Sequence, residues 1–152
     1  GGQQPYDAVV TNVQSIKGLL AQHGATGTPI WVTETSTYDG TPAAPNTGES
    51  FPTQTEEQQA RDLVKRLVFP LASDVDVVLW SQTGDYTSSN WFFDHVGVVH
   101  VDGSKKLAYW AFQKLAEWLQ SVKWTQLRQV TPVTSVPNGE NGLVPGRAKV
   151  AP

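Results

Sequence analysis

Apolar residues near the start of the chain recur at the spacing of an amphipathic helix. Over residues 6–22 they stand three or four positions apart, which places them on one helical stripe: Val9, Val13, Ile16 and Leu20. Gly24 follows the stripe, and glycine readily adopts the left-handed conformation that ends many helices. The pattern predicts a helix over residues 6–22 that stops at this glycine.

Two short apolar runs predict buried strands, with a second helix between them. The runs cover residues 29–34 and 75–81, and the second is nearly continuous in apolar residues, as in a strand that is covered on both faces. Between them, Thr55 and Gln58 match a capping box, in which the two side chains bond each other's backbone amides at a helix start. The helix is expected to run to about Leu71, with a buried face made of Ala60, Leu63, Val64, Leu67, Val68 and Leu71.

A long connection follows each predicted strand. The first covers residues 35–53, and the second covers residues 82–104 and includes a β-like stretch that turns at residues 102–103. Ser104 is expected to cap a last helix that runs to about Gln120, whose apolar side includes Leu107, Ala111, Leu115 and Leu119. The order helix, strand, helix, strand, helix is that of a parallel α/β fold.

The predicted sheet is incomplete by itself. Only two clear strands are present, and two parallel strands cannot cover each other on both faces, so neighbouring strands are needed. After Trp124 the composition changes to Thr, Val, Pro and Gly, with four prolines in the last 28 residues. We therefore expect one folded segment over residues 1–123 and an extended arm or linker over residues 124–152.

The chain has the composition of one globular domain. Its 152 residues are 39% hydrophobic and 16% charged, a balance that supports a folded core. The net charge is −3 and the eleven basic residues form no stripe, so nucleic acid is not an expected partner. No apolar run approaches the roughly 18 residues of a membrane span, so no membrane-spanning segment is expected either.

The residue types present give no reason to expect a cofactor. The chain has no cysteine, which excludes disulfides and thiolate metal sites. Its three histidines, His23, His95 and His100, lie apart without the spacing of a metal site. The six tryptophans, four tyrosines and five phenylalanines favour a secreted protein that handles polysaccharides, with a generic globular core rich in aromatic residues as the alternative.

Two residues at the ends of the predicted strands carry candidate chemistry. Glu34 ends the first strand, and parallel α/β proteins place their active sites at the carboxyl ends of strands. Trp80 is near the end of the second strand, and an aromatic face can stack on the apolar face of a pyranose. The alternatives are a helix cap or salt bridge for Glu34 and ordinary core packing for Trp80.

Four pieces of the sequence, taken in order, resemble the C-terminal part of a clan A glycoside hydrolase, a (β/α)8 TIM-barrel retaining glycosidase. The resemblance covers about residues 6–119 and rests on the seventh strand at 29–34, the start of the seventh helix at 55–60, the eighth strand at 75–81, and the closing hairpin and eighth helix at 97–112. It implies that Glu34 is the catalytic nucleophile and that Trp80 forms the floor of a sugar subsite. The peptide after this tryptophan is often cis in the clan, so a cis peptide is expected at Trp80–Ser81.

The resemblance also implies a missing half of the site. A retaining glycosidase uses a second carboxyl group, about 5–5.5 Å from the nucleophile, as acid and then base. In the clan this acid comes from the fourth strand, so the isolated chain is expected to be inactive. The expected partners are a carbohydrate substrate and the missing N-terminal half of the barrel or another chain. Asp39, Glu49 and Asp85 could reach the site in principle, but we interpret them as solvated loop carboxylates.

Other residues of the predicted rims have less specific interpretations. Trp91, with its two phenylalanine neighbours, either walls a sugar site or plugs the mouth of the barrel. Asp74 and Asp76 flank the entrance to the second strand, on the opposite rim, and are expected to stabilise the fold. His95 and His100 are expected to be hydrogen-bonded loop residues.

A second function remains open from the sequence. The chain can instead be a non-catalytic carbohydrate-binding or structural assembly module derived from a barrel fragment, because its open strand edges can accept another chain. A flavodoxin-like or Rossmann-like domain is rejected. No glycine-rich turn leads from a strand into a helix, since Gly24 and Gly27 precede a strand.

Overall fold

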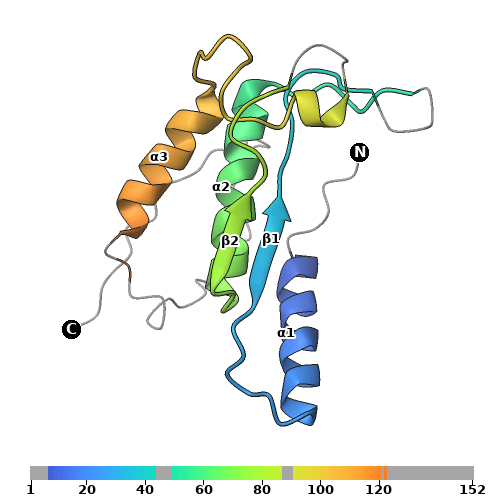
Figure 1. The fold of residues 1–152 in the computed structure, drawn as a ribbon, viewed down its shortest axis with the longest axis vertical. Helices are drawn as coiled ribbons and strands as arrows, with labels where there is room; N and C mark the ends of the chain where they lie inside the picture. Colours follow the sequence, from blue (N-terminus) through green and yellow to red (C-terminus); the bar gives the residue numbers. More distant parts are fainter. Residues whose placement is uncertain (1–6, 44–48, 87–90, 121, 123–152) are drawn as a thin grey trace, which may run out of the picture.

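The computed structural model describes residues 7–43, 49–86, 91–120 and 122, and these form a mixed α/β fold (Figure 1). The elements are α1 (Asp7–Gln22), β1 (Trp31–Thr35), α2 (Glu56–Ala72), β2 (Val77–Trp80), the 3-10 helix η1 (Phe92–Asp94) and α3 (Leu107–Leu119). The predicted order of helices and strands is confirmed. The arm predicted over residues 124–152 lies outside the described residues. No described helix has the length and apolar character needed to cross a bilayer.

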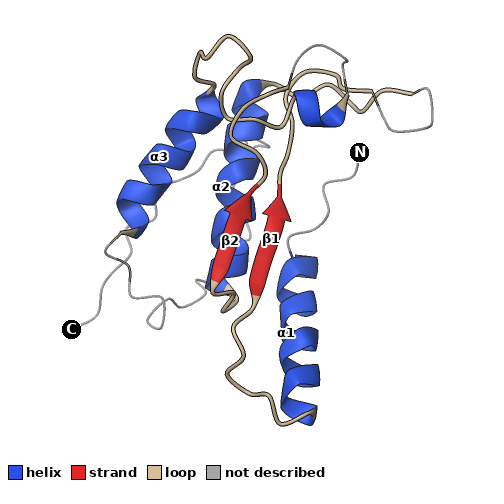
Figure 2. Ribbon diagram, in the orientation of Figure 1, coloured by secondary structure: helices blue, strands red, loops and turns tan. Residues whose placement is uncertain are grey.

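The two strands form a parallel sheet, as predicted. Their Cα partners are Trp31 with Val77, Val32 with Val78, and Thr35 with Trp80. Both strands point toward the same end of the sheet, where the loops that follow them and η1 gather (Figure 2). The loop between α1 and β1 lies at the opposite end. The carboxyl ends of both strands therefore share one rim.

The core lies between α2, α3 and one face of the sheet. Its buried cluster consists of Leu63, Leu67, Val98, Ala108 and Leu115. Val78 and Trp80 of β2 pack against this cluster from the sheet side. The predicted buried face of α2 is confirmed at its centre, where Leu63 is fully buried. In α3 the predicted apolar side is buried at Leu115, whereas Leu107 is 51% exposed.

No described element covers the other face of the sheet (Figure 1). Trp31 is 58% exposed and Leu79 is 45% exposed. Side chains alternate across a strand, so these two residues face away from the cluster that Val78 contacts. The stripe predicted on α1 is also only partly covered, because Val13 is buried whereas Ile16 is 44% exposed. Parallel sheets are normally buried on both faces, and the described elements bury only one face of this sheet.

The capping box predicted at the start of α2 is confirmed. The Thr55 hydroxyl oxygen accepts a hydrogen bond from the Gln58 amide at 3.2 Å, and the Gln58 side-chain oxygen accepts one from the Thr55 amide at 2.7 Å. The left-handed stop predicted after α1 is confirmed as well, since Gly24 has a φ of 70°. Local sequence rules therefore describe these two helix ends correctly.

The cap predicted for α3 is wrong. Ser104 lies in the preceding turn, where its amide and hydroxyl both donate to Asp102 Oδ1, at 2.8 and 2.6 Å. The helix begins instead after Lys106, and the Leu107 amide donates to Glu56 Oε2 of α2 at 2.9 Å. A carboxylate from another helix thus satisfies an amide that a local hydroxyl was expected to satisfy.

Thr55→Ala is expected to lower the free energy of unfolding by about 1 kcal/mol, because a helix N-cap hydroxyl is lost. Urea denaturation followed by circular dichroism measures this change. Thr26→Ala is the matched control, since Thr26 is exposed in the loop between α1 and β1, and a change below about 0.5 kcal/mol is expected there. Equal changes in the two variants would contradict the role of the cap.

Candidate functional site

Glu34 is the residue before the last one of β1, and its side chain is exposed. The strand pairing shifts between Val32 and Thr35, so β1 contains one residue more than β2 over this stretch. Such bulges redirect side chains and are frequent near active sites. Here Thr33 and Glu34 are both exposed in succession. Among the described residues no hydrogen bond or ion pair reaches the Glu34 carboxylate, so it is accessible to a ligand.

Trp80 ends β2, beside Thr35 of β1. Its ring packs against the core cluster, and its indole N–H donates to the Val96 carbonyl at 3.2 Å. These contacts fix the orientation of the ring, and its contact with a sugar stays a prediction. The expected cis peptide at Trp80–Ser81 is wrong by one position, since the cis peptide lies at Ser81–Gln82.

Aromatic side chains join the loops that follow the two strands. Tyr38 and Phe51 of the first loop meet Phe92 of η1, and all three ring centroids lie 5.5–5.7 Å from one another. Phe93 extends this group, with 5.5 Å between its ring centroid and that of Phe92, and the Trp91 ring lies 4.9 Å from the Phe93 ring. Trp91 is 46% exposed. It therefore lies at the solvent-facing side of an aromatic cluster on the same rim as Glu34.

The hydroxyl of Tyr38 is hydrogen-bonded to the first loop. Burial raises the pKa of Tyr38 above its usual value, and a hydrogen bond with the Gln54 side chain opposes that rise. The hydroxyl donates to the Pro52 carbonyl at 2.9 Å. Asp102 lies in the turn before α3. The hydrogen bond from the Ser104 hydroxyl is the main cause that lowers the pKa of Asp102, and the hydrogen bond from the Ser104 amide lowers it further. The hydrogen bonds of Tyr38 and Asp102 therefore stabilise the loops that contain these two residues.

Lys106 is fully buried at the start of α3 and contacts two aspartates of the loops that follow β1 and β2. Its Nζ atom lies 2.8 Å from Asp39 Oδ1 and 2.7 Å from Asp85 Oδ2. The Asp39 side chain is only 14% exposed and that of Asp85 only 7%. The interpretation of Asp39 and Asp85 as solvated loop carboxylates is therefore wrong. A buried ammonium holds them inside the fold, where neither is available to a substrate.

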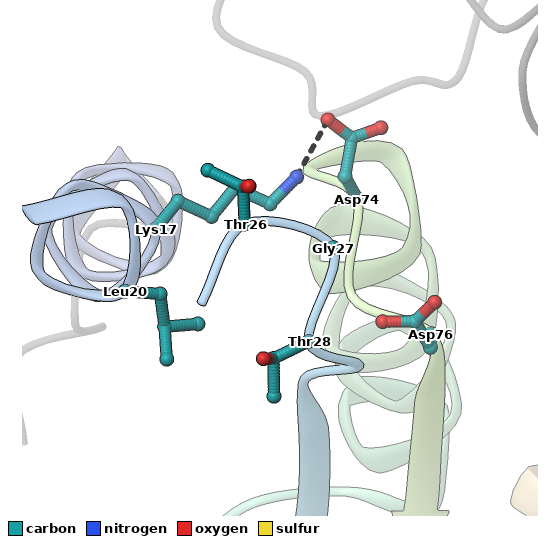
Figure 3. Close-up of a pocket in the computed structure, with 7 residues that line it drawn as sticks. All are labelled: Lys17, Leu20, Thr26, Gly27, Thr28, Asp74 and Asp76. Atoms are coloured by element: carbon teal, nitrogen blue, oxygen red, sulfur yellow. Dashed lines mark hydrogen bonds and ion pairs between the residues drawn. The ribbon is translucent and has the colours of Figure 1, made fainter. Parts of the chain in front are cut away.

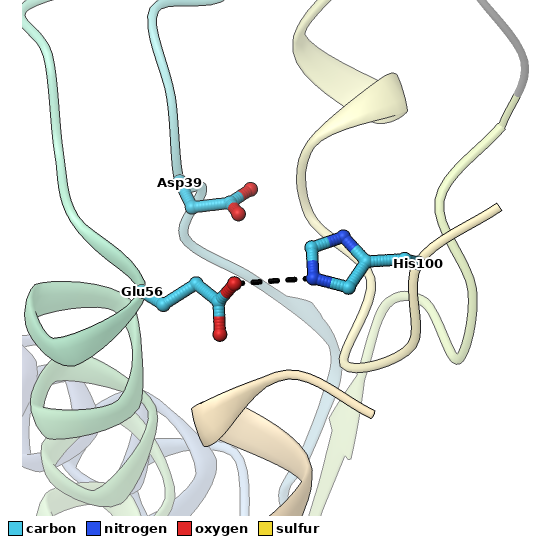
Figure 4. A group of neighbouring side chains, drawn as sticks. All are labelled: Asp39, Glu56 and His100. Atoms are coloured by element: carbon cyan, nitrogen blue, oxygen red, sulfur yellow. Dashed lines mark hydrogen bonds and ion pairs between the residues drawn. The ribbon is translucent and has the colours of Figure 1, made fainter. Parts of the chain in front are cut away.

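Glu56 and His100 extend this group of charges toward α2. His100 Nε2 lies 3.1 Å from Glu56 Oε1 (Figure 4), and His100 Nδ1 lies 3.8 Å from Asp85 Oδ2. His95 Nδ1 lies 3.9 Å from Asp39 Oδ1. The expectation that His100 is a hydrogen-bonded loop residue is confirmed. We refer to Lys106, Asp39, Asp85, Glu56 and His100 as the rim charge network.

Three members of the rim charge network have ligand types that suit a metal ion. The candidate ligand atoms of Asp39, Glu56 and His100 lie within 4.8 Å of one another (Figure 4). The sequence spacing of the histidines had indicated no such group. However, the Lys106 ammonium is already 2.8 Å from Asp39, and a metal ion beside it would be repelled by its charge. The protein's own cation neutralises this part of the network.

Gln59 holds the same loops through their backbone. It is fully buried, and its side-chain amide lies within hydrogen-bonding distance of the carbonyl oxygens of Thr37, His95 and Gly97, at 3.2, 3.1 and 3.2 Å. The sequence reasoning missed Gln59, although a signal was present. It lies four residues before Leu63, on the buried stripe of α2, where a polar residue requires internal partners.

Gly97 allows the second loop to fold back on itself. A Cβ atom at this position would collide with the backbone of Gly84 and Asp85 and would lie 2.8 Å from Asp85 Oδ1. The Gly97 amide donates to that same oxygen at 2.9 Å. The close approach thus positions Asp85 for its contact with Lys106.

At the opposite rim a cavity of about 310 Å³ lies beside α1 (Figure 3). Lys17 and Asp74 form an ion pair at its edge, with 2.9 Å between Nζ and Oδ2. Asp76 Oδ2 accepts a hydrogen bond from the Ile30 amide at 2.8 Å. Asp74 and Asp76 therefore connect α1 and β1 to the turn before β2, which agrees with the stabilising role expected for them.

The structure places the predicted residues in two groups on one rim. Glu34 and Trp80 lie on adjacent strands, and Trp91 lies at the exposed side of the loop cluster. The rim charge network lies in the loops that follow the two strands and at the starts of α2 and α3, and sequence reasoning did not predict it. Comparison of the chain with models of known protein families finds no match, and comparison with curated proteins finds none either.

Proposed function

We propose that this chain supplies the nucleophile-bearing C-terminal part of a (β/α)8-barrel retaining glycoside hydrolase. The observation that carries the proposal is the Glu34 carboxylate. It is exposed, it stands on a bulge at the carboxyl end of a parallel strand, and no described residue pairs with it. Parallel α/β folds use this end of their strands for catalysis.

In the proposed reaction Glu34 attacks the anomeric carbon and forms a covalent glycosyl intermediate. A carboxylic acid on the other side of the scissile bond protonates the leaving oxygen, and then acts as base for the water that releases the sugar. Asp39 and Asp85 are held by Lys106, so neither supplies this acid. We assign the acid to strands that complete the barrel and are not part of this chain.

The uncovered sheet face supports completion by further strands. Trp31 and Leu79 expose large apolar side chains there, and burial of such a side chain stabilises a fold by about 1.5–3 kcal/mol. The unpaired edges of a two-stranded sheet also offer backbone groups to neighbouring strands. Trp91 is exposed on the catalytic rim and offers an aromatic face to a pyranose ring.

The decisive experiment is covalent labelling of the full-length protein with a panel of 2-deoxy-2-fluoroglycosides. The expected adduct is on the peptide that contains Glu34, and Glu34→Gln is expected to lower kcat/KM by about 1,000-fold or more. Mass spectrometry locates the adduct. Glu117→Gln is the control, because Glu117 lies on the last turn of α3, away from the strand ends, with a side chain that is 47% exposed, and its loss should leave turnover unchanged. An adduct elsewhere, or full activity of Glu34→Gln, would refute the proposal.

A second candidate is a non-catalytic carbohydrate-binding or assembly module. The observation in its favour is that Asp39 and Asp85, two nearly buried carboxylates of the rim loops, both form ion pairs with Lys106. This candidate predicts sugar binding that depends on Trp91, without an adduct at Glu34. Calorimetric titration of the wild-type protein and Trp91→Ala with the same sugars separates the two functions.

A further inference from the structure

Lys106 has no part in the proposed reaction, yet it is the largest fully buried side chain among the described residues. It stands immediately before α3. Asp39 follows Glu34 by five residues, and Asp85 follows Trp80 by five residues. One buried ammonium thus contacts both of the loops that leave the proposed catalytic strands.

The buried ammonium has as many neighbouring oxygens as it has N–H donors. A lysine ammonium has three N–H donors, and three oxygens surround this one: Asp39 Oδ1 at 2.8 Å, Asp85 Oδ2 at 2.7 Å and the His95 carbonyl at 3.4 Å. Removal of an ion from water is costly unless partners replace the water. The three charges must therefore remain together for any of them to stay buried.

Backbone hydrogen bonds carry this constraint into both loops. The Asp39 amide donates to the His95 carbonyl at 3.2 Å, and the Lys106 amide donates to the Val98 carbonyl at 3.1 Å. Asp85 uses its other oxygen for the Gly97 amide. The two loops and the start of α3 consequently form one connected unit on the rim that carries Glu34.

We propose that Lys106 is a positioning residue of the candidate active site. Its charge holds the loops after β1 and β2 in one arrangement, and this arrangement places Glu34 and the exposed face of Trp91 for a sugar. The inference about substrate placement rests on the proposed function. The inference about the loops does not, because it concerns contacts within this chain alone.

Hydrogen exchange of the 152-residue chain tests the loop part of the proposal. In the triple variant Lys106→Met/Asp39→Asn/Asp85→Asn all three charges are removed together, which avoids an unpaired buried charge. Amides of residues 36–43 and 82–86 are expected to exchange at least about tenfold faster than in the wild type, while α1 keeps its protection. Lys105→Met is the control, because Lys105 is exposed and lies over the rings of Tyr109 and Trp110. Wild-type protection of both loops in the triple variant would overturn the proposal.

A cysteine variant separates the charge of Lys106 from its volume. The chain contains no cysteine, so Lys106→Cys introduces a unique thiol that can be alkylated in urea before refolding. Aminoethylation restores a lysine-like ammonium and is expected to restore loop protection. Propylation supplies a neutral chain of similar length and is expected not to. Equal restoration by both groups would show that packing alone fixes the loops, and would overturn the role of the charge.

Labelling of Glu34 tests the link to catalysis. In the full-length triple variant, the maximal rate constant of labelling by the fluoroglycoside is expected to fall by about 100-fold, since small displacements of reacting groups have effects of this size. The half-saturating concentration should change much less. An unchanged rate constant would overturn the positioning role. Absence of any adduct in the wild-type protein would overturn the proposed function, and the exchange experiment would still decide the loop part.

Discussion

Gly97→Ala is expected to lower the free energy of unfolding by about 3 kcal/mol or more, because overpacking at a rigid contact is strongly destabilising. The new methyl group would meet the backbone of Gly84 and Asp85 rather than the movable end of a side chain. Relief of the collision requires residues 84–85 to move away from Gly97, within the same loop. Asp85 would then lose its position beside Lys106.

Urea denaturation of Gly97→Ala, followed by circular dichroism, measures the effect. Gly18→Ala is the matched control. Gly18 lies within α1 and no atom stands within 4 Å of the position its Cβ would take, so alanine there is expected to raise stability by about 0.5–1 kcal/mol. A wild-type unfolding midpoint for Gly97→Ala would show that the loop accommodates the methyl group, and that the close approach is not required.

Lys106→Met is expected to lower the free energy of unfolding by about 3–5 kcal/mol. Methionine can fill much of the space of the lysine stem. The lost stability therefore comes from the missing positive charge rather than from a cavity. Asp39 and Asp85 would remain in a nearly buried position without their shared cation. Their like charges would repel each other in a medium that screens them less than water does.

Two further variants test whether the loss of stability comes from the unpaired charges. In the triple variant Lys106→Met/Asp39→Asn/Asp85→Asn the repulsion is gone, and most of the lost stability should return. Lys105→Met removes a neighbouring exposed lysine and its contacts with the Tyr109 and Trp110 rings, and should lower the free energy of unfolding by no more than about 1 kcal/mol. If Lys106→Met and Lys105→Met unfold at the same urea concentration, the buried ion pairs of Lys106 do not stabilise the fold.

Helices and strands could be predicted where the local sequence determines them. The box at Thr55 and the stop at Gly24 depend on residues within one helical turn, and both are present in the structure. The apolar runs also predicted the two parallel strands. The cap of α3 could not be found this way, because the acceptor for the Leu107 amide is Glu56, which is distant in sequence.

The position of the candidate site could be predicted from the sequence, but several of its residues could not. The place of Glu34 follows from the end of an apolar run. Its exposure depends on the shift in pairing with β2, which only the partner strand reveals. Lys106 gives no signal of burial, since lysines are almost always exposed unless they are paired. Its partners lie on two long loops, and only the folded chain brings them together.

The contact between Lys106 and Asp39 spans 67 residues of sequence, and this separation has a consequence for the order of folding. A contact of long range closes a large loop, and the entropy of that closure must be overcome before the contact contributes any energy. During synthesis from the N-terminus, Asp39 and Asp85 leave the ribosome before Lys106 does. The rim therefore cannot reach its final structure until the chain has been made as far as α3, and the nascent loops before that point carry two aspartates without their cation.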